Sequence, residues 1–232
     1  MAKRKVANPL AFAVLGSLSE RPMHPYEIST MLKTRGKDQS IKLNYGSLYS
    51  VVAALQKHGL IEAVETVREG NRPERTVYAL TAAGGQEFDE WLSEFIGEPS
   101  RDFSQLEAGL AYMPALSPDR TVELLDQRRQ ALQAEVDRLE AVHVSPQLKS
   151  LPRLFWVESE FRLAMLKAEV AYVEQLAEEI RTDKLEGGAF WRHGHEVMRD
   201  QGVAPGELFA HPEKYLDEED VAWLRNLPDQ TQ

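Results

Sequence analysis

The chain has 232 residues, of which 43% are hydrophobic and 28% are charged, and it contains no cysteine. That composition is typical of an ordinary folded protein, and the length is sufficient for two domains. The lack of cysteine excludes disulfides, thiolate metal sites and cysteine catalysis. No apolar run is long enough for a transmembrane helix, and the apolar run over 10–18 has the length of a core helix and lacks the small-residue cleavage site of a signal peptide, so we expect a cytoplasmic protein that does not enter a membrane.

The net charge of −10 is distributed unevenly along the chain. Residues 1–85 hold 12 basic and 7 acidic residues, whereas the remainder holds 15 basic and 30 acidic residues. A basic N-terminal part and an acidic remainder are expected when one end of a protein meets phosphate. An acidic surface can also serve solubility alone, so the charge favours nucleic acid only modestly.

Three helices are predicted at the N-terminal end. Asn8 and Pro9 suit the cap and first turn of a helix that continues to about residue 18. A second helix is predicted over 25–32. A third begins near residue 44 and ends at Gly59, which is placed for a helix C-cap.

After Gly59 the apolar pattern changes from helical spacing to alternation. The segments 60–67 and 76–80 alternate as strands do, and the polar loop between them carries glycine, asparagine and proline. Thr81 is placed to cap a fourth helix. The sequence therefore predicts a mainly α protein whose residues 1–97 form a winged helix-turn-helix of three helices and a β-hairpin wing.

Five short motifs lie in this part of the chain, over roughly residues 8–95. They are Leu15-Gly16-Ser17-Leu18, Pro25-Tyr26-Glu27-Ile28, Tyr45-Gly46-Ser47-Leu48-Tyr49, Leu55-Gln56-Lys57-His58-Gly59-Leu60-Ile61 and Tyr78-Ala79-Leu80-Thr81. In this order they resemble the PadR family of bacterial transcriptional regulators. Two positions depart from the family pattern: Pro25 replaces the usual glycine, and Ser50 stands where proline commonly follows the tyrosine. The resemblance implies a DNA-binding protein, in most members a repressor.

The third helix is the candidate for the DNA major groove, whose width admits a helix. Arginines on the tip of the wing are candidates for the minor groove, and Arg72 is the best placed of them. The candidate DNA-binding residues are Lys42, Asn44, Tyr45, Ser47, Tyr49, Arg68, Arg72 and Arg75. Tyr49 either reaches phosphate or packs into the core, and Asn44 either contacts DNA or only caps the helix. The basic segment 3–5 is either a phosphate-binding arm or a solubilising tail.

Beyond residue 97 the sequence predicts two long amphipathic helices, one from residue 118 and one over 153–182. The resemblance implies that residues 98–186 form a helical dimerisation domain. The apolar stripes expected at a homodimer interface comprise Val122, Leu125, Leu132, Val136, Leu139, Leu163, Leu166, Val170 and Val173. The alternative is that the two helices bury their stripes against each other within one chain. Residues 187–232 form a C-terminal extension of unknown role.

The resemblance to the PadR family implies that a pocket for a small-molecule effector can be present, since some members sense such molecules. Aromatic residues are the candidates for lining it. They are Phe155, Trp156, Phe161 and Trp191. Aromatic residues at helical spacing are more often part of the core. His193 and His195 are two residues apart and would point to different faces of a helix, so no metal site is expected and no cofactor is predicted.

The sequence thus favours a homodimeric regulator that binds a palindromic operator in double-stranded DNA and is released by a small-molecule effector. The motifs of phosphate-binding loops, nucleophile elbows, metal-binding helices and kinases are absent, so we do not expect an enzyme. The remaining alternative is an adaptor protein that keeps the winged helix without binding DNA.

Overall fold

The structure is a computed structural model that describes residues 6, 8–37, 45–67, 75–99 and 104–222. The chain divides into two compact units, Met1–Asp102 and Phe103–Gln232, which we call the N-terminal unit and the helical unit. None of the described helices combines the length and the apolarity that crossing a membrane requires.

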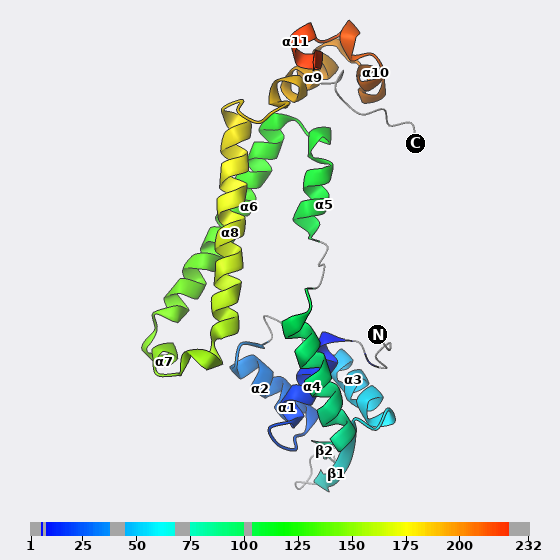
Figure 1. The fold of residues 1–232 in the computed structure, drawn as a ribbon, viewed down its shortest axis with the longest axis vertical. Coiled ribbons are helices and arrows are strands. Elements are labelled where there is room, and N and C mark those ends of the chain that lie inside the picture. The colour runs from blue at the N-terminus through cyan, green and yellow to red at the C-terminus, as the bar shows by residue number, and fades with distance from the viewer. Residues whose placement is uncertain (1–5, 7, 38–44, 68–74, 100–103, 223–232) are drawn as a thin grey trace. The chain divides into compact units, whose positions relative to one another are not determined.

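The N-terminal unit is a winged helix-turn-helix, as the sequence predicts. Its elements are α1 (Pro9–Leu18), α2 (Pro25–Thr34), α3 (Tyr45–Lys57), β1 (Ile61–Val67), β2 (Arg75–Leu80) and α4 (Ala82–Gly97) (Figure 1). Asn8 caps α1 and Thr81 caps α4 through their side-chain oxygens, and Pro9 occupies the first turn of α1. Local sequence signals therefore set the beginnings of both helices.

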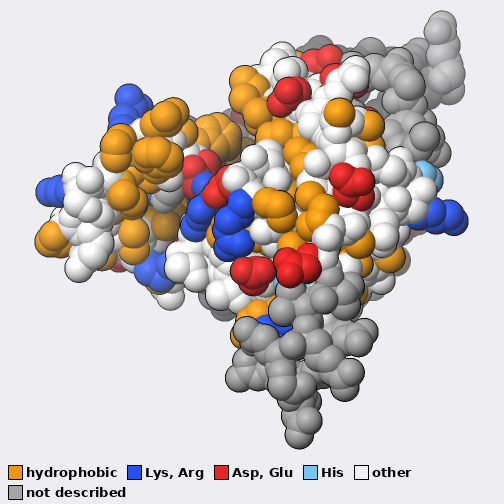
Figure 2. Space-filling model, turned by 90° about the horizontal axis from the view of Figure 1, so that it is seen from below, with side chains coloured by type: hydrophobic (Ala, Val, Ile, Leu, Met, Phe, Trp, Pro, Cys, Tyr) orange, Lys and Arg blue, Asp and Glu red, His pale blue; other side chains and the backbone are white. Residues whose placement is uncertain are grey.

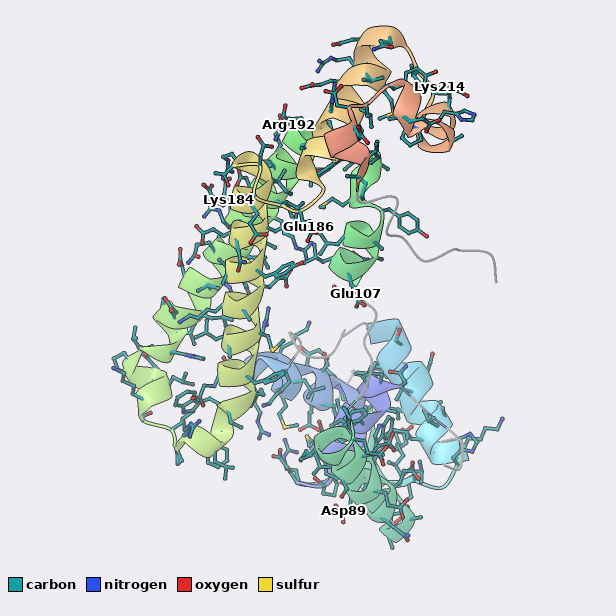
Figure 3. The ribbon with its side chains drawn as sticks, turned by 45° about the horizontal axis from the view of Figure 1, so that its top comes forward. Asp89, Glu107, Lys184, Glu186, Arg192 and Lys214 are labelled. Atoms are coloured by element: carbon teal, nitrogen blue, oxygen red, sulfur yellow. The ribbon has the colours of Figure 1, made fainter. Side chains whose placement is uncertain are left out.

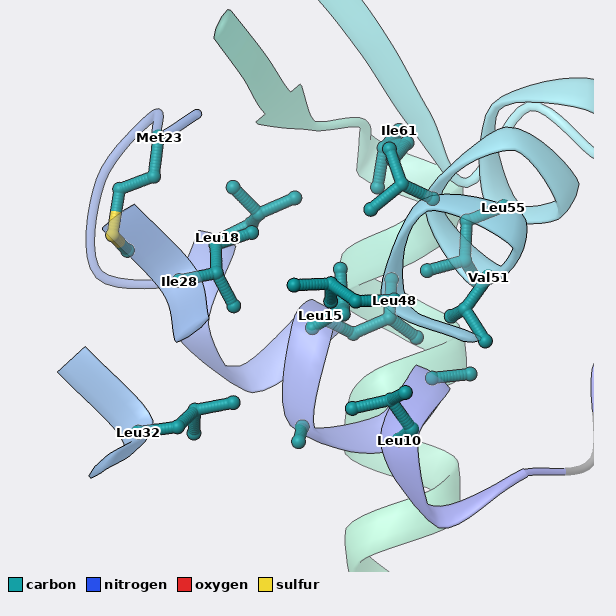
Figure 4. Packing of buried hydrophobic residues seen from close by; sticks show 14 of the residues in the cluster. Leu10, Leu15, Leu18, Met23, Ile28, Leu32, Leu48, Val51, Leu55 and Ile61 are labelled. Atoms are coloured by element: carbon teal, nitrogen blue, oxygen red, sulfur yellow. The ribbon is translucent and has the colours of Figure 1, made fainter. Parts of the chain in front are cut away.

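The core of this unit surrounds α1, which carries Leu10, Val14, Leu15 and Leu18 on its buried face. Figure 4 shows Leu15 meeting Leu48 of α3 in the middle of the cluster. Met23, Ile28, Leu32 and Ile61 close its other sides. Because these side chains lie at helical spacing on three helices, their burial fixes which face each helix turns outward.

The sheet consists of β1 and β2 paired antiparallel, with Ile61 opposite Leu80 and Val67 opposite Arg75. A bulge between Ala63 and Glu65 shifts the register. Met23 adds a single antiparallel bridge on the free side of β2, where it exchanges two backbone hydrogen bonds of 3.0 Å with Tyr78. The start of α2 is therefore tied to the base of the wing.

The helical unit contains α5 (Gln105–Ala111), α6 (Pro118–His143), α7 (Pro146–Lys149), α8 (Val157–Arg181), α9 (Gly188–Gln201), α10 (Pro205–Ala210) and α11 (Glu218–Val221). Short 3-10 helices span Met113–Ala115, Arg153–Phe155 and Pro212–Lys214. The two long helices that the sequence predicts correspond to α6 and α8, which lie side by side (Figure 1). Helix α8 is shorter than the predicted range 153–182, because the 3-10 helix Arg153–Phe155 precedes it.

Ion pairs connect α6 and α8 along their length. They are Asp126–Arg181 at 3.0 Å, Arg128–Glu169 at 2.5 Å, Glu135–Arg162 at 2.7 Å and Glu140–Lys167 at 2.5 Å. Pairs this exposed contribute little to stability individually. Their joint effect is to favour one register of the two helices, since a slip would break them together.

The segment after residue 187 packs onto the helical unit through α9. Trp191 is buried with Leu125, Val173 and Ile180, and its indole Nε1–H donates to the Leu116 carbonyl at 2.7 Å. Arg192 reaches Asp119 at 2.9 Å and Asp183 at 3.0 Å, at the junction of α9 with the ends of the long helices (Figure 3). The structure thus places α9 in the same unit as α6 and α8, although the sequence suggested a boundary at 187.

Candidate DNA interface

Helix α3 is held in the N-terminal unit by one apolar face. Leu48, Val51, Val52 and Leu55 recur every three or four residues and are all buried. The opposite face therefore points away from the core, and its small side chains are exposed: Gly46, Ser47, Ser50 and Ala53. A helix with small outward residues can approach DNA bases closely.

Tyr49 belongs to this outward side of α3. Its side chain is 51% exposed, whereas the neighbouring Leu48 is fully buried. Of the two alternatives for Tyr49, core packing is therefore not what the structure shows. The phenol hydroxyl is available as a hydrogen-bond donor to a phosphate oxygen.

Three of the eight DNA-binding candidates have described side chains, namely Ser47, Tyr49 and Arg75. All three are exposed, the first two on α3 and the third at the start of β2. Tyr45 opens α3. Lys42, Asn44, Arg68 and Arg72 lie outside the described residues, as does the basic segment 3–5.

The turn from α3 into the wing depends on Gly59. Its φ of +73° is in the left-handed region that glycine adopts readily. The amide of Leu60 then donates to the carbonyl of Leu55 at 3.0 Å, which closes the helix end. Ile61 is the first residue of β1, so only the short turn over residues 58–60 separates the wing from α3.

Basic residues of the α1–α2 region are mostly engaged by carboxylates. Arg35 binds both carboxylate oxygens of Glu20, and Arg21 lies 3.4 Å from Glu27. The hydrogen bond from Arg35 lowers the pKa of Glu20, so this carboxylate stays charged at neutral pH. On the face drawn in Figure 2, Lys and Arg side chains lie interspersed with Asp and Glu side chains. The described basic side chains on this face therefore alternate with acidic ones.

The four aromatic residues predicted for an effector pocket are not brought together. Phe155 and Phe161 are 64% and 67% exposed, and Phe155 and Trp156 directly precede the N-terminal end of α8. Trp191 packs near Ile180 at the opposite end of that helix. At 1.5 Å per residue, the 25-residue α8 separates these sites by roughly 35 Å, too far for one cavity within a chain.

Of the nine residues predicted for the dimer interface, four are buried inside one chain. They are Leu125, Val136, Leu139 and Val173. The other five, Val122, Leu132, Leu163, Leu166 and Val170, are partly buried. The pairing of α6 with α8 thus uses most of both predicted stripes, as the alternative interpretation of the sequence allowed.

A different face of α8 remains exposed and apolar. Phe161, Met165, Ala168 and Tyr172 recur every three or four residues, and the three large side chains are 67%, 55% and 52% exposed. We call these four residues the α8 stripe. Their spacing is visible in the sequence, but so is that of the residues now buried against α6, and periodicity alone does not separate the two faces.

The fold and the outward face of α3 define a winged-helix protein of the kind that binds DNA. Residues 14–90, about a third of the chain, match the model of the transcriptional regulator PadR-like family. The family resemblance that the sequence motifs carry is thereby confirmed.

A curated relative is the "Negative transcriptional regulator PadR" of Bacillus subtilis (strain 168). It is 27% identical over 149 residues, which cover 63% of this chain and 79% of the relative.

Solved structures share the fold. B. subtilis PadR in complex with operator DNA has a TM-score of 0.57 and 21% identity, over 73% of this chain and 98% of that chain. The complex of the same protein with p-coumaric acid has a TM-score of 0.57 and 18% identity, over 73% and 96%. The Vibrio cholerae virulence activator AphA has a TM-score of 0.56 and 16% identity, over 75% and 98%. About a quarter of this chain therefore has no counterpart in these three structures.

Proposed function

We propose that the protein is a DNA-binding transcriptional regulator and not an enzyme, and that it acts in the cytoplasm as a homodimer on a palindromic operator. Helix α3 enters the major groove with Ser47 and Tyr49, and the wing brings Arg72 to the adjacent minor groove and Arg75 to a backbone phosphate. A two-fold dimer doubles the short half-site that one winged helix can read.

The observation that carries this proposal is the outward, polar face of α3 within a domain that matches the PadR-like model. The names of the relatives support it, since one structure contains operator DNA and the curated relative is a negative regulator. We propose repression on that basis, although AphA, which shares the fold, is named an activator.

Selection of genomic DNA fragments by the purified protein tests the proposal. We expect enrichment of one or a few fragments that share a palindrome. Recovery of no fragment above a bead-only control would contradict DNA binding and favour an adaptor protein that keeps the winged helix.

The α8 stripe is the proposed site of dimerisation. An exposed row of Phe161, Met165, Ala168 and Tyr172 costs free energy in water, at about 25 cal/mol per Å² of apolar surface. A second copy of the same helix offers a complementary row, as a two-fold interface requires. This interface leaves the α6–α8 packing of each chain intact.

We also propose that a small-molecule effector releases the protein from DNA. One structure that shares the fold contains p-coumaric acid, which suggests an aromatic acid as the class of ligand. Addition of p-coumaric acid to the protein–operator complex is expected to release the DNA in a gel-shift titration. An unchanged bound fraction at saturating acid would remove this compound as the effector.

The salt dependence of DNA binding tests quantitatively whether Arg75 of the wing contacts a phosphate. If each protomer neutralises one phosphate with this side chain, Arg75→Gln should reduce the slope of log K against log salt by about 1.8 for the dimer. Lys149→Gln removes the same charge from the exposed surface of α7 in the helical unit and should leave the slope unchanged. Equal slopes for wild type and Arg75→Gln would exclude Arg75 from phosphate contact.

A further inference from the structure

His24 caps α2 with its ring, an unusual role for histidine. The backbone amide of Tyr26 donates to His24 Nδ1 at 3.0 Å, and the backbone amide of His24 donates to Glu27 Oε2 at 2.9 Å. A ring nitrogen that accepts a hydrogen bond carries no proton, so the single proton of the neutral ring lies on Nε2. The cap thus fixes His24 as a donor through Nε2–H.

The sheet places this ring on the same side as Arg75. Met23 bridges Tyr78, and both side chains belong to the core side of β2. Because side chains alternate along extended backbone, His24 falls on the opposite side, which it shares with Val77 and Arg75.

The surroundings of His24, its burial first of all, favour its neutral form. Burial lowers the pKa of the ring, the positive charge of Arg75 lowers it further, and Glu27 acts in the opposite direction. A neutral ring agrees with the hydrogen bond that Nδ1 accepts from Tyr26.

The backbone at this helix end is already satisfied. Pro25 has no amide hydrogen, and the amides of Tyr26 and Ile28 donate to the side chain and carbonyl of His24. Glu27 is engaged by the amide of His24. Among the described residues at this junction, the groups left to hold a ligand are two side-chain donors, His24 Nε2–H and the exposed guanidinium of Arg75.

We propose that His24 and Arg75 together bind one backbone phosphate of DNA at the junction of α2 with the wing. A phosphate offers several acceptor oxygens, and one charged and one neutral donor on the same side of the sheet match it. This inference rests on the proposed DNA-binding function and adds a fixed contact outside α3. The phosphate that His24 and Arg75 share is the same one that Arg75 neutralises in the salt-dependence test above.

His24→Asn is the test variant, because asparagine is a good helix N-cap and lacks a donor at the position of Nε2. We expect its unfolding temperature to equal that of the wild type. In fluorescence anisotropy with a random-sequence DNA duplex, we expect binding about tenfold weaker per lost charge-assisted contact. The salt slope should not change, since a neutral donor releases no counterion. His211→Asn makes the same replacement at an exposed position of the helical unit and should bind as the wild type.

The double variant His24→Asn/Arg75→Gln separates a shared phosphate from two independent contacts. If both side chains bind one phosphate, the double variant should lose less affinity than the product of the two single losses. Wild-type affinity in His24→Asn, or fully multiplicative losses, would overturn this inference while leaving the proposed function intact. Failure of the wild-type protein to bind any duplex would overturn the proposed function and this inference with it.

Discussion

Replacing Gly84 with alanine is expected to destabilise the N-terminal unit by about 3 kcal/mol, the upper end of the usual cost of overpacking. A Cβ atom at this position would lie 1.9 Å from the carbonyl oxygen of Leu60 and 2.9 Å from Leu80 Cδ1. The backbone oxygen cannot turn aside as the end of a side chain could. It also accepts hydrogen bonds from the amide and hydroxyl of Thr81, at 3.2 Å and 3.0 Å.

Gly85 provides the matched control for this prediction. A Cβ atom on Gly85 would meet only Leu80 Cδ2, at the ordinary contact distance of 3.8 Å. Gly85→Ala should therefore be neutral or slightly stabilising, since alanine has the higher helix propensity. Urea unfolding followed by circular dichroism compares the two variants. Similar midpoints for Gly84→Ala and Gly85→Ala would mean that α4 does not pack on the Leu60 carbonyl as described.

The N-terminal unit could be predicted from sequence because its signals are local. Asn8 and Thr81 cap the helices that the sequence assigns to them, and Gly59 ends α3 at a positive φ. The change from helical spacing to alternation marks the start of β1. Each of these signals acts within a few residues, so tertiary context does not override it.

The helical unit was harder to predict because its faces are assigned by long-range packing. Both α6 and α8 carry apolar residues on more than one side, and only their pairing decides which become buried. That pairing joins residues such as Arg128 and Glu169, which are 41 positions apart in the chain. The sequence therefore predicted the two helices and allowed burial within one chain, but it did not identify Val136 and Val173 as residues that this pairing buries.

The residues of the candidate DNA interface also divide into those that local sequence predicts and those that only tertiary packing reveals. The exposed position of Ser47 could be predicted, because a helix with one buried stripe must turn its other face outward, whereas for Tyr49 the sequence left core packing open. His24 could not be predicted, since a histidine between Met23 and Pro25 looks like any residue of a turn. Its role became visible only when the Met23–Tyr78 bridge placed it beside the wing.

Replacing Met165 with glutamate is the prediction with the largest expected effect on assembly. Met165 lies in the middle of the α8 stripe and is 55% exposed in the single chain, so the substitution leaves the chain's own packing intact. In a two-fold dimer formed through the α8 stripe, the interface would bury two unpaired carboxylates, one from each chain. At about 1.5 kcal/mol or more for each, the dimer dissociation constant should rise at least about 100-fold.

Sedimentation velocity at micromolar concentration measures this effect directly. We expect wild-type dimers and Met165→Glu monomers, with weaker operator binding because a monomer engages one half-site. Ala131→Glu is the control, since Ala131 is exposed on α6 and is not part of the α8 stripe. Dimers of unchanged affinity in Met165→Glu would show that copies associate through another surface. A palindromic operator would still be expected in that case, because it requires a two-fold dimer and not a particular interface.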